Sequence, residues 1–159
     1  MFVHLGMLPV ELYPIYLDLI DVAVKEIGLP PDRLLYCHVD MLVADVEKPR
    51  MNLELLHRFL DKGINISCDG FGLYLGESIP CKITDTERVD AVCQFIREGY
   101  SEQIMLGHDF GLRTNGTVYG GYGYTRVPAY ACPALIEKGC TEEDVRQLTI
   151  ENPKKFLAY

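Results

Sequence analysis

The sequence predicts an α/β protein built from four successive strand–helix units. Short apolar runs with the length of buried strands alternate with longer segments in which apolar residues recur every three or four positions. Glycine, proline or a helix-capping residue separates these segments. Since 159 residues, 48% of them hydrophobic, suffice for one compact core, we expect a single domain over residues 1–159. Consecutive units of this kind favour a parallel sheet covered by helices.

Glycines end the helices of the first two units. Residues 1–5 form the first predicted strand, and the helical pattern of residues 12–27 stops before Gly28, with two prolines close behind. The second strand is predicted at residues 34–37. Its helix follows after a loop and ends at Gly63, because a glycine adopts the left-handed conformation that closes many helices.

The third unit has the clearest helix start. Its strand is predicted at residues 64–68, and its helix begins with a capping box from Thr84 to Glu87 and ends at Gly99. The fourth strand is predicted at residues 104–106. Three helical segments are expected after it: one near residues 129–138, one capped by Thr141, and a last turn capped by Asn152.

Composition excludes several classes of protein. The net charge of -8 and the scattered basic residues argue against a nucleic-acid partner, which needs clustered lysine and arginine. No apolar run approaches the roughly 20 residues of a membrane span, and the first residues do not resemble a signal peptide, so we expect no membrane association and a cytoplasmic location. The six cysteines form no Cys-x-x-Cys pair, and we interpret them as reduced.

Chelating or acidic residues follow each of the four predicted strands. They are His4, then His38 and Asp40, then Asp69, then His108 and Asp109. In a (β/α)8 barrel these strand ends form one rim, where catalytic groups converge. An open doubly wound sheet is the alternative, but it would usually carry a glycine-rich first turn that is absent here. Because a full barrel needs roughly 250 residues, the prediction is a partial TIM barrel of four strand–helix units.

Several segments together resemble the second half of phosphotriesterase-related proteins, within the amidohydrolase superfamily. The segments are Val3-His4-Leu5, residues 35–40 (LYCHVD), residues 104–109 (IMLGHD), residues 120–124 (GGYGY) and residues 151–157 (ENPKKFL). Their order and spacing extend the resemblance over essentially the whole chain. The resemblance implies that His4 ends the fifth barrel strand, His38 the sixth and Asp109 the eighth.

In that family these three positions bind a pair of divalent metal ions, usually zinc, so the resemblance implies a binuclear centre in the complete barrel. The family's other ligands are a His-x-His pair on the first strand and a carboxylated lysine or a glutamate on the fourth. Neither has a counterpart in this chain. The resemblance therefore implies a C-terminal half that lacks part of its metal site.

The residue types suit this chemistry independently of the resemblance. Two imidazoles and a carboxylate are ligands suited to Zn²⁺ or a similar ion, although a single histidine at a strand end is more often structural. Asp109 is expected to bind metal and to accept a proton from the attacking water. Asp40 lies two residues after His38 and is the candidate for relaying that proton; the alternative is an aspartate that caps the following loop.

Substrate contacts are expected from Asp69 and from the long glycine-rich segment after the fourth strand. Asp69 would orient the substrate or a metal ligand, whereas Gly70 stands where some relatives carry a proton-shuttling histidine. Arg113 suits a carboxylate or phosphate, and Tyr122 and Tyr124 suit a pocket wall. The alternative is that these tyrosines only pack on the rim. His108 and His57 are interpreted as packing and surface residues.

Two functions remain open at this stage. The first is a metal-dependent hydrolase of a small-molecule lactone, carboxylic ester or phosphoester, completed by a partner chain or by the rest of a longer product that supplies the N-terminal half-barrel. The second is a non-catalytic half-barrel that self-associates through its bare sheet edges as a structural or metal-binding homo-oligomer.

Overall fold

A computed structural model describes residues 1–5, 8–44, 50–73 and 83–158 of the chain. Its sheet has four parallel strands in the order β1-β2-β3-β4, so each strand pairs with the next one along the sequence. The strands are β1 (Phe2–His4), β2 (Leu35–Cys37), β3 (Asn65–Cys68) and β4 (Ile104–Leu106). These strands confirm the predicted α/β class and all four predicted strand positions.

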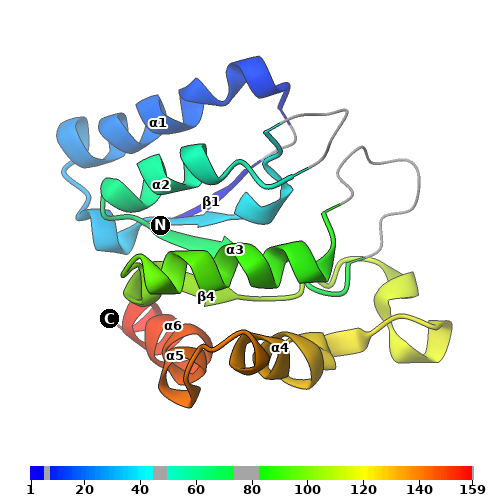
Figure 1. Ribbon diagram of the computed structural model, residues 1–159. Coiled ribbons are helices and arrows are strands. Elements are labelled where there is room, and N and C mark those ends of the chain that lie inside the picture. The colour runs from blue at the N-terminus through cyan, green and yellow to red at the C-terminus, as the bar shows by residue number, and fades with distance from the viewer. Residues whose placement is uncertain (6–7, 45–49, 74–82, 159) are drawn as a thin grey trace.

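Helices connect the strands and continue after β4 (Figure 1). The α-helices are α1 (Pro14–Asp21), α2 (Leu53–Asp61), α3 (Asp85–Arg97), α4 (Cys132–Glu137), α5 (Glu142–Arg146) and α6 (Asn152–Leu157). Three π-helical turns extend them: η2 (Val22–Glu26), η10 (Val127–Ala131) and η11 (Gln147–Glu151). The 3-10 turns are η1 (Val10–Leu12), η3 (Pro31–Arg33), η4 (Val39–Met41), η6 (Ser101–Gln103), η7 (Arg113–Asn115), η8 (Thr117–Tyr119) and η9 (Gly123–Thr125).

Local capping chemistry explains where two of the helices begin and where two of them end. The capping boxes at Thr84 and Thr141 are both formed. In each, the threonine hydroxyl accepts the backbone N–H of the residue three positions later, and the side chain of that residue accepts the backbone N–H of the threonine. Gly63 and Gly99 follow their helices with φ of 79° and 94°, in the left-handed region that favours glycine. These starts and ends confirm the corresponding predictions.

The prediction that Asn152 caps the last turn is wrong. Asn152 has helical backbone angles and joins η11 to α6 without a break. Its side chain is 1% exposed and donates to the carbonyls of Ser101 and Ile104, both at 2.7 Å. The asparagine therefore ties the last helix to the start of β4, a tertiary contact between segments that are remote in the sequence.

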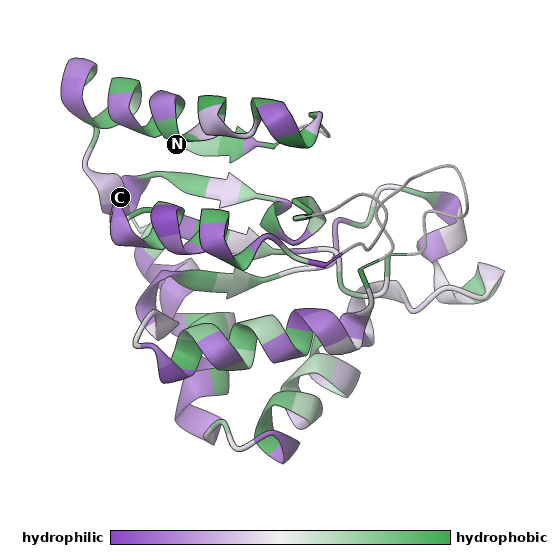
Figure 2. Ribbon diagram, turned by 45° about the horizontal axis from the view of Figure 1, so that its top comes forward, coloured by the Kyte–Doolittle hydropathy of each residue, from purple (hydrophilic) through white to green (hydrophobic). Residues whose placement is uncertain are grey.

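The two faces of the sheet have different surroundings. Tyr36, Ile66 and Ile104 lie on the face that packs against α1, α2 and α3, and all three are fully buried in the main hydrophobic core. In Figure 2 the strands are mainly hydrophobic, and hydrophilic residues lie on the helix surfaces turned away from them. The opposite face carries a small second cluster in which Leu35 and Met105 pack on Phe156 of α6. Helices thus cover one face of the sheet thickly, and the opposite face carries the smaller apolar cluster.

Two further observations concern membrane spans and cysteines within the described residues. None of the helices there is long and apolar enough to cross a membrane. Every cysteine it describes is a free thiol, and Cys81 lies outside the described residues.

Candidate metal centre

His4 and His38 converge at the carboxyl ends of adjacent strands. His4 is the last residue of β1, and His38 follows β2 directly, so the parallel pairing of these strands places the two imidazoles together. Their Nε2 atoms are in direct contact, and the ring centroids lie 3.9 Å apart with the planes at 71°. Both rings therefore direct the same nitrogen at one point, as two imidazoles do when they share an ion.

Asp69 fixes the orientation of the His38 ring. The His38 Nδ1 donates to Asp69 Oδ1 at 2.7 Å, and the His38 backbone N–H donates to the same carboxylate at 3.1 and 3.2 Å. Because Nδ1 carries the proton in this bond, the lone pair of Nε2 is left free. This hydrogen bond also raises the pKa of His38 above its ordinary value, and burial acts in the opposite direction.

Two non-glycine residues in the described chain have positive φ, and both are predicted metal ligands. His38 has φ of 61° and Asp109 has φ of 41°, in a region that costs such residues about 1–3 kcal/mol. Asp109 Oδ2 lies 3.8 Å from His38 Nδ1, the ring nitrogen that also bonds Asp69. The structure therefore places His38 next to both other predicted ligands, His4 and Asp109.

Asp40 and Arg88 form a buried ion pair next to Asp69. Asp40 is 0% exposed and accepts Arg88 Nε at 2.5 Å, while its oxygens also accept the backbone N–H groups of Asp69 and Gly70 at 3.3 and 2.9 Å. Burial raises the pKa of Asp40, and Arg88 opposes that rise. Since both oxygens are engaged, the geometry favours a structural role that holds the turn after β3 over the predicted proton relay.

Three of the four predicted substrate-binding residues lie on the segment after β4, and each packs against another side chain of that segment. Arg113 packs on the Tyr119 ring with its guanidinium carbon 4.4 Å from the centroid. The Tyr122 ring lies 4.1 Å from the guanidinium carbon of Arg126. Tyr124 stacks on Phe110 with centroids 4.2 Å apart. This arrangement matches the packing alternative for the tyrosines, yet half or more of each tyrosine remains exposed.

The backbone of the segment after β4 leaves no room for a side chain at position 121. A Cβ atom added to Gly121 would overlap backbone atoms of Thr114 and Asn115. The Asn115 side chain is buried and accepts the Leu112 N–H at 2.9 Å. The segment therefore has a defined backbone shape with aromatic side chains displayed on it.

His108 and His57 lie where the sequence interpretation placed them. His108 Nε2 accepts the Val127 N–H at 2.9 Å, and burial lowers the pKa of His108. His57 of α2 lies 2.6 Å from Glu98 Oε2 at the surface. Neither ring contributes to the His4–His38 pair.

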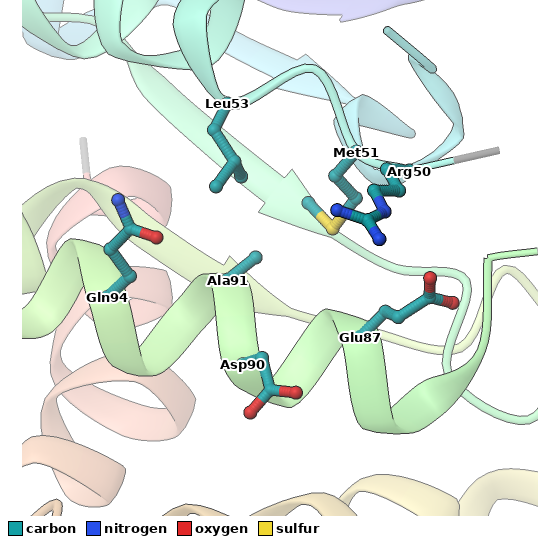
Figure 3. Close-up of a pocket in the computed structure, with 7 residues that line it drawn as sticks. All are labelled: Arg50, Met51, Leu53, Glu87, Asp90, Ala91 and Gln94. Carbon is teal, nitrogen blue, oxygen red and sulfur yellow. The ribbon is translucent and has the colours of Figure 1, made fainter. Parts of the chain in front are cut away.

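A pocket of about 350 Å³ lies between α2 and α3, apart from the centre (Figure 3). It is lined by Arg50, Met51, Leu53, Glu87, Asp90, Ala91 and Gln94. None of the predicted site residues is in its wall, so the pocket belongs to the helical exterior of the sheet.

Comparison with known proteins matches residues 33–157 to the model of the phosphotriesterase family. The chain belongs to the phosphotriesterase family. A phosphotriesterase-related protein of Drosophila melanogaster is 30% identical over 155 residues, which cover 95% of this chain and 40% of the relative. An N-acetyltaurine hydrolase of Salmo salar is 28% identical and covers 85% of this chain and 38% of the relative.

A solved structure shows the same fold. The phosphotriesterase homology protein of Escherichia coli, complexed with phosphate in its active site, superposes with a TM-score of 0.79 at 22% identity. The match covers 99% of this chain and 47% of that protein. The chain thus spans about two fifths to one half of the length of the family members that it matches.

The donor set fits part of a metal site of this family. His4 and His38 offer two converging Nε2 atoms, and the bond from Asp69 keeps His38 in the tautomer that a metal ion requires. Among the residues that the structure describes, no three histidine, cysteine or carboxylate side chains are grouped closely enough to hold an ion by themselves. The two imidazoles therefore need further ligands.

Sequence reasoning missed the ion-pair network around Asp40. Asp85 accepts Arg88 Nη1 at 3.2 Å and Arg126 Nε at 2.6 Å, so it links the buried pair to the segment after β4. One signal was available: Arg88 stands four residues before Val92 and seven before Phe95, on the apolar stripe of its helix. An arginine on such a stripe indicates a buried charge partner.

Proposed function

We propose that this chain is the C-terminal half of a metal-dependent hydrolase barrel that acts on a lactone, a carboxylic ester or a phosphoester. The observation that carries this proposal is the convergence of His4 and His38 Nε2 at the ends of two adjacent parallel strands. In a barrel such strand ends form the catalytic rim. The similarity of nearly the whole chain to about half of a phosphotriesterase homology protein supports the half-barrel.

His4 and His38 are the residues that we expect to hold a divalent metal ion, with Asp109 as a further ligand. Zinc is the expected ion because imidazole and carboxylate donors suit it, and we expect a second ion in the complete barrel. Such an ion, when bound, polarises the ester or phosphoryl oxygen and lowers the pKa of water. The proposed hydrolysis depends on that chemistry.

The chain's own residues have separate proposed tasks. Asp109 has a side chain that is 37% exposed, and we propose that its carboxylate accepts the proton of the attacking water. Asp69 keeps His38 oriented through the Nδ1 bond. Arg113, Tyr122 and Tyr124 are proposed to contact the substrate from the rim. For Asp40, a positioning role replaces the proton relay as the favoured proposal.

The exposed apolar surface beside β1 is the place where we expect the missing half to pack. Leu12, Ile15, Leu19 and Val22 form a stripe along α1 and its ends, and they are 51%, 50%, 45% and 39% exposed. Phe2 of the edge strand β1 is 61% exposed. Strand pairing at this edge would cover both features. We propose that the preceding strand–helix units, carried by a partner chain or by the same gene product, occupy this surface.

Metal binding tests the proposed centre without any assay of activity. The chain, in complex with a second chain that supplies the preceding strand–helix units, is titrated with Co²⁺ followed by absorbance, and with Zn²⁺ in competition. We expect His4→Ala and His38→Ala to abolish binding and Asp69→Asn to weaken it about 10- to 100-fold. His57→Ala is the matched control, because His57 pairs with Glu98 far from the centre. Equal binding by His38→Ala and the wild type would overturn the assignment.

Activity is tested after adding a second chain that supplies the preceding strand–helix units with a His-x-His pair. Lactones, aryl esters and a phosphotriester are the substrates, and N-acetyltaurine is included because a relative is named for its hydrolysis. We expect turnover only in the complex, and its loss in Asp109→Asn. A metal-loaded complex that hydrolyses none of these compounds would favour the non-catalytic homo-oligomer.

A further inference from the structure

Two buried cysteines, far apart in the sequence, have their sulfurs in contact. Cys93 Sγ and Cys140 Sγ lie 3.2 Å apart, and the residues are 1% and 7% exposed. Cys93 is on α3, and Cys140 follows Gly139, the left-handed residue after α4. A disulfide has an S–S distance of about 2.05 Å, so the two sulfurs would have to move about 1 Å closer to form the covalent bond.

The surrounding contacts hold both sulfurs in this position. The Cys140 N–H donates to the Leu135 carbonyl at 3.0 Å, which fixes the turn after α4. Two cross-connections join this turn to α3: Lys138 Nζ lies 2.7 Å from Asp90 Oδ1, and Arg97 Nη2 donates to the Lys138 carbonyl at 2.6 Å. Because these contacts flank the sulfurs, the backbone that carries the thiols is already set for cross-linking.

We propose that Cys93 and Cys140 are a redox-sensitive dithiol that closes to a disulfide when the chain reacts with a small-molecule disulfide. In the first step the Cys140 thiolate attacks the reagent and releases one small thiol. Cys93 then loses its proton and attacks Cys140 Sγ, and the second small thiol leaves. The protein loses two electrons and two protons, and the reagent disulfide gains them as two thiols.

The order of these steps follows from exposure and acidity. Cys140 is the more exposed of the two, so it meets the reagent first. Burial, followed by the contact with Cys140, raises the pKa of Cys93 to about 12. The second step is therefore slow near neutral pH, since the thiolate is the nucleophile, and the closure is expected to accelerate as the pH rises.

The disulfide would close a loop that contains the strand β4, Asp109 and the glycine-rich segment after it. Cross-linking residues 47 positions apart restricts the unfolded chain and stabilises the native state if the geometry is unstrained. For a chain of this size we expect the Tm to rise by about 10 °C on oxidation. The proposal does not depend on the metal centre.

The test uses the purified 159-residue chain in buffers of reduced and oxidised glutathione. We expect the number of free thiols, counted after unfolding, to fall from six to four. Peptide mapping by mass spectrometry should then identify a cross-link between the peptides of Cys93 and Cys140. The rise in Tm should appear with the cross-link and disappear after reduction.

Two variants control the assignment. Cys140→Ser should lose the cross-link and the rise in Tm, whereas Cys132→Ser on the neighbouring α4 should retain both. A folded wild-type chain that keeps both thiols free, or carries separate glutathione adducts on them, would overturn the proposal even if a variant fails to fold. A cross-link without a rise in Tm would contradict the inferred native geometry.

Discussion

Replacing Arg88 with methionine should cost this chain about 3–5 kcal/mol of unfolding free energy. Asp40 is 0% exposed and Arg88 is 5% exposed, and their closest atoms are 2.5 Å apart. Methionine matches the aliphatic part of the arginine side chain but removes the charged guanidinium, so among the described residues Asp40 would retain the backbone N–H groups of Asp69 and Gly70 as partners. The size of the loss reflects an uncompensated carboxylate in the core.

Urea unfolding followed by far-UV circular dichroism measures this loss. Arg97→Met is the matched control, because Arg97 is exposed on the same helix and donates a hydrogen bond to the Lys138 carbonyl; we expect it to cost about 1 kcal/mol or less. Adding Asp40→Asn to Arg88→Met should recover part of the stability, since it removes the stranded charge. A loss for Arg88→Met no larger than that for Arg97→Met would refute the reasoning.

Three further substitutions test individual contacts. Gly70→Ala should cost about 1–3 kcal/mol in the same assay, because its Cβ would lie 2.6 Å from Asp40 Oδ2 and 2.7 Å from Arg88 Nη2; wild-type stability would contradict this packing. Asn152→Ala should cost about 2 kcal/mol by leaving two buried carbonyls unpaired, and an effect near zero would show that the carbonyls find other partners. Glu98→Gln should cost about 0.5 kcal/mol at pH 6. The hydrogen bond with His57 lowers the pKa of Glu98, so this cost should begin to fall once the pH drops below the ordinary glutamate pKa of about 4.3 and should vanish below the lowered pKa of Glu98; a cost that persists at still lower pH would exclude the ion pair.

The strands and helices were predictable because their signals are local. The capping box at Thr84 and the glycines at positions 63 and 99 act within a few residues, and the structure has each helix boundary near them. The prediction for Asn152 was wrong for the same reason. An asparagine before a proline has the local signature of a cap, but here hydrogen bonds to carbonyls about 50 residues away keep it inside the helix.

The candidate centre was predictable only in part. Parallel strands necessarily bring their carboxyl ends to one edge, so the sequence positions of His4 and His38 were enough to place them together. The direction of the Asp109 side chain depends on the left-handed backbone at that residue, which a sequence pattern does not reveal. Likewise, the ion pair joins Asp40 to a residue 48 positions away. Its sequence signal is weak: an arginine, Arg88, on the apolar stripe of a helix.

The close backbone contacts of Gly121 limit which residues the segment after β4 can carry at that position. A side chain at that position would collide with main-chain atoms of Thr114 and Asn115, so this backbone path requires a glycine there. The rings of Tyr122 and Tyr124, by contrast, project from it with half or more of their surface open. A library that tests the proposed substrate contacts of the two tyrosines should therefore randomise them and hold the glycine constant.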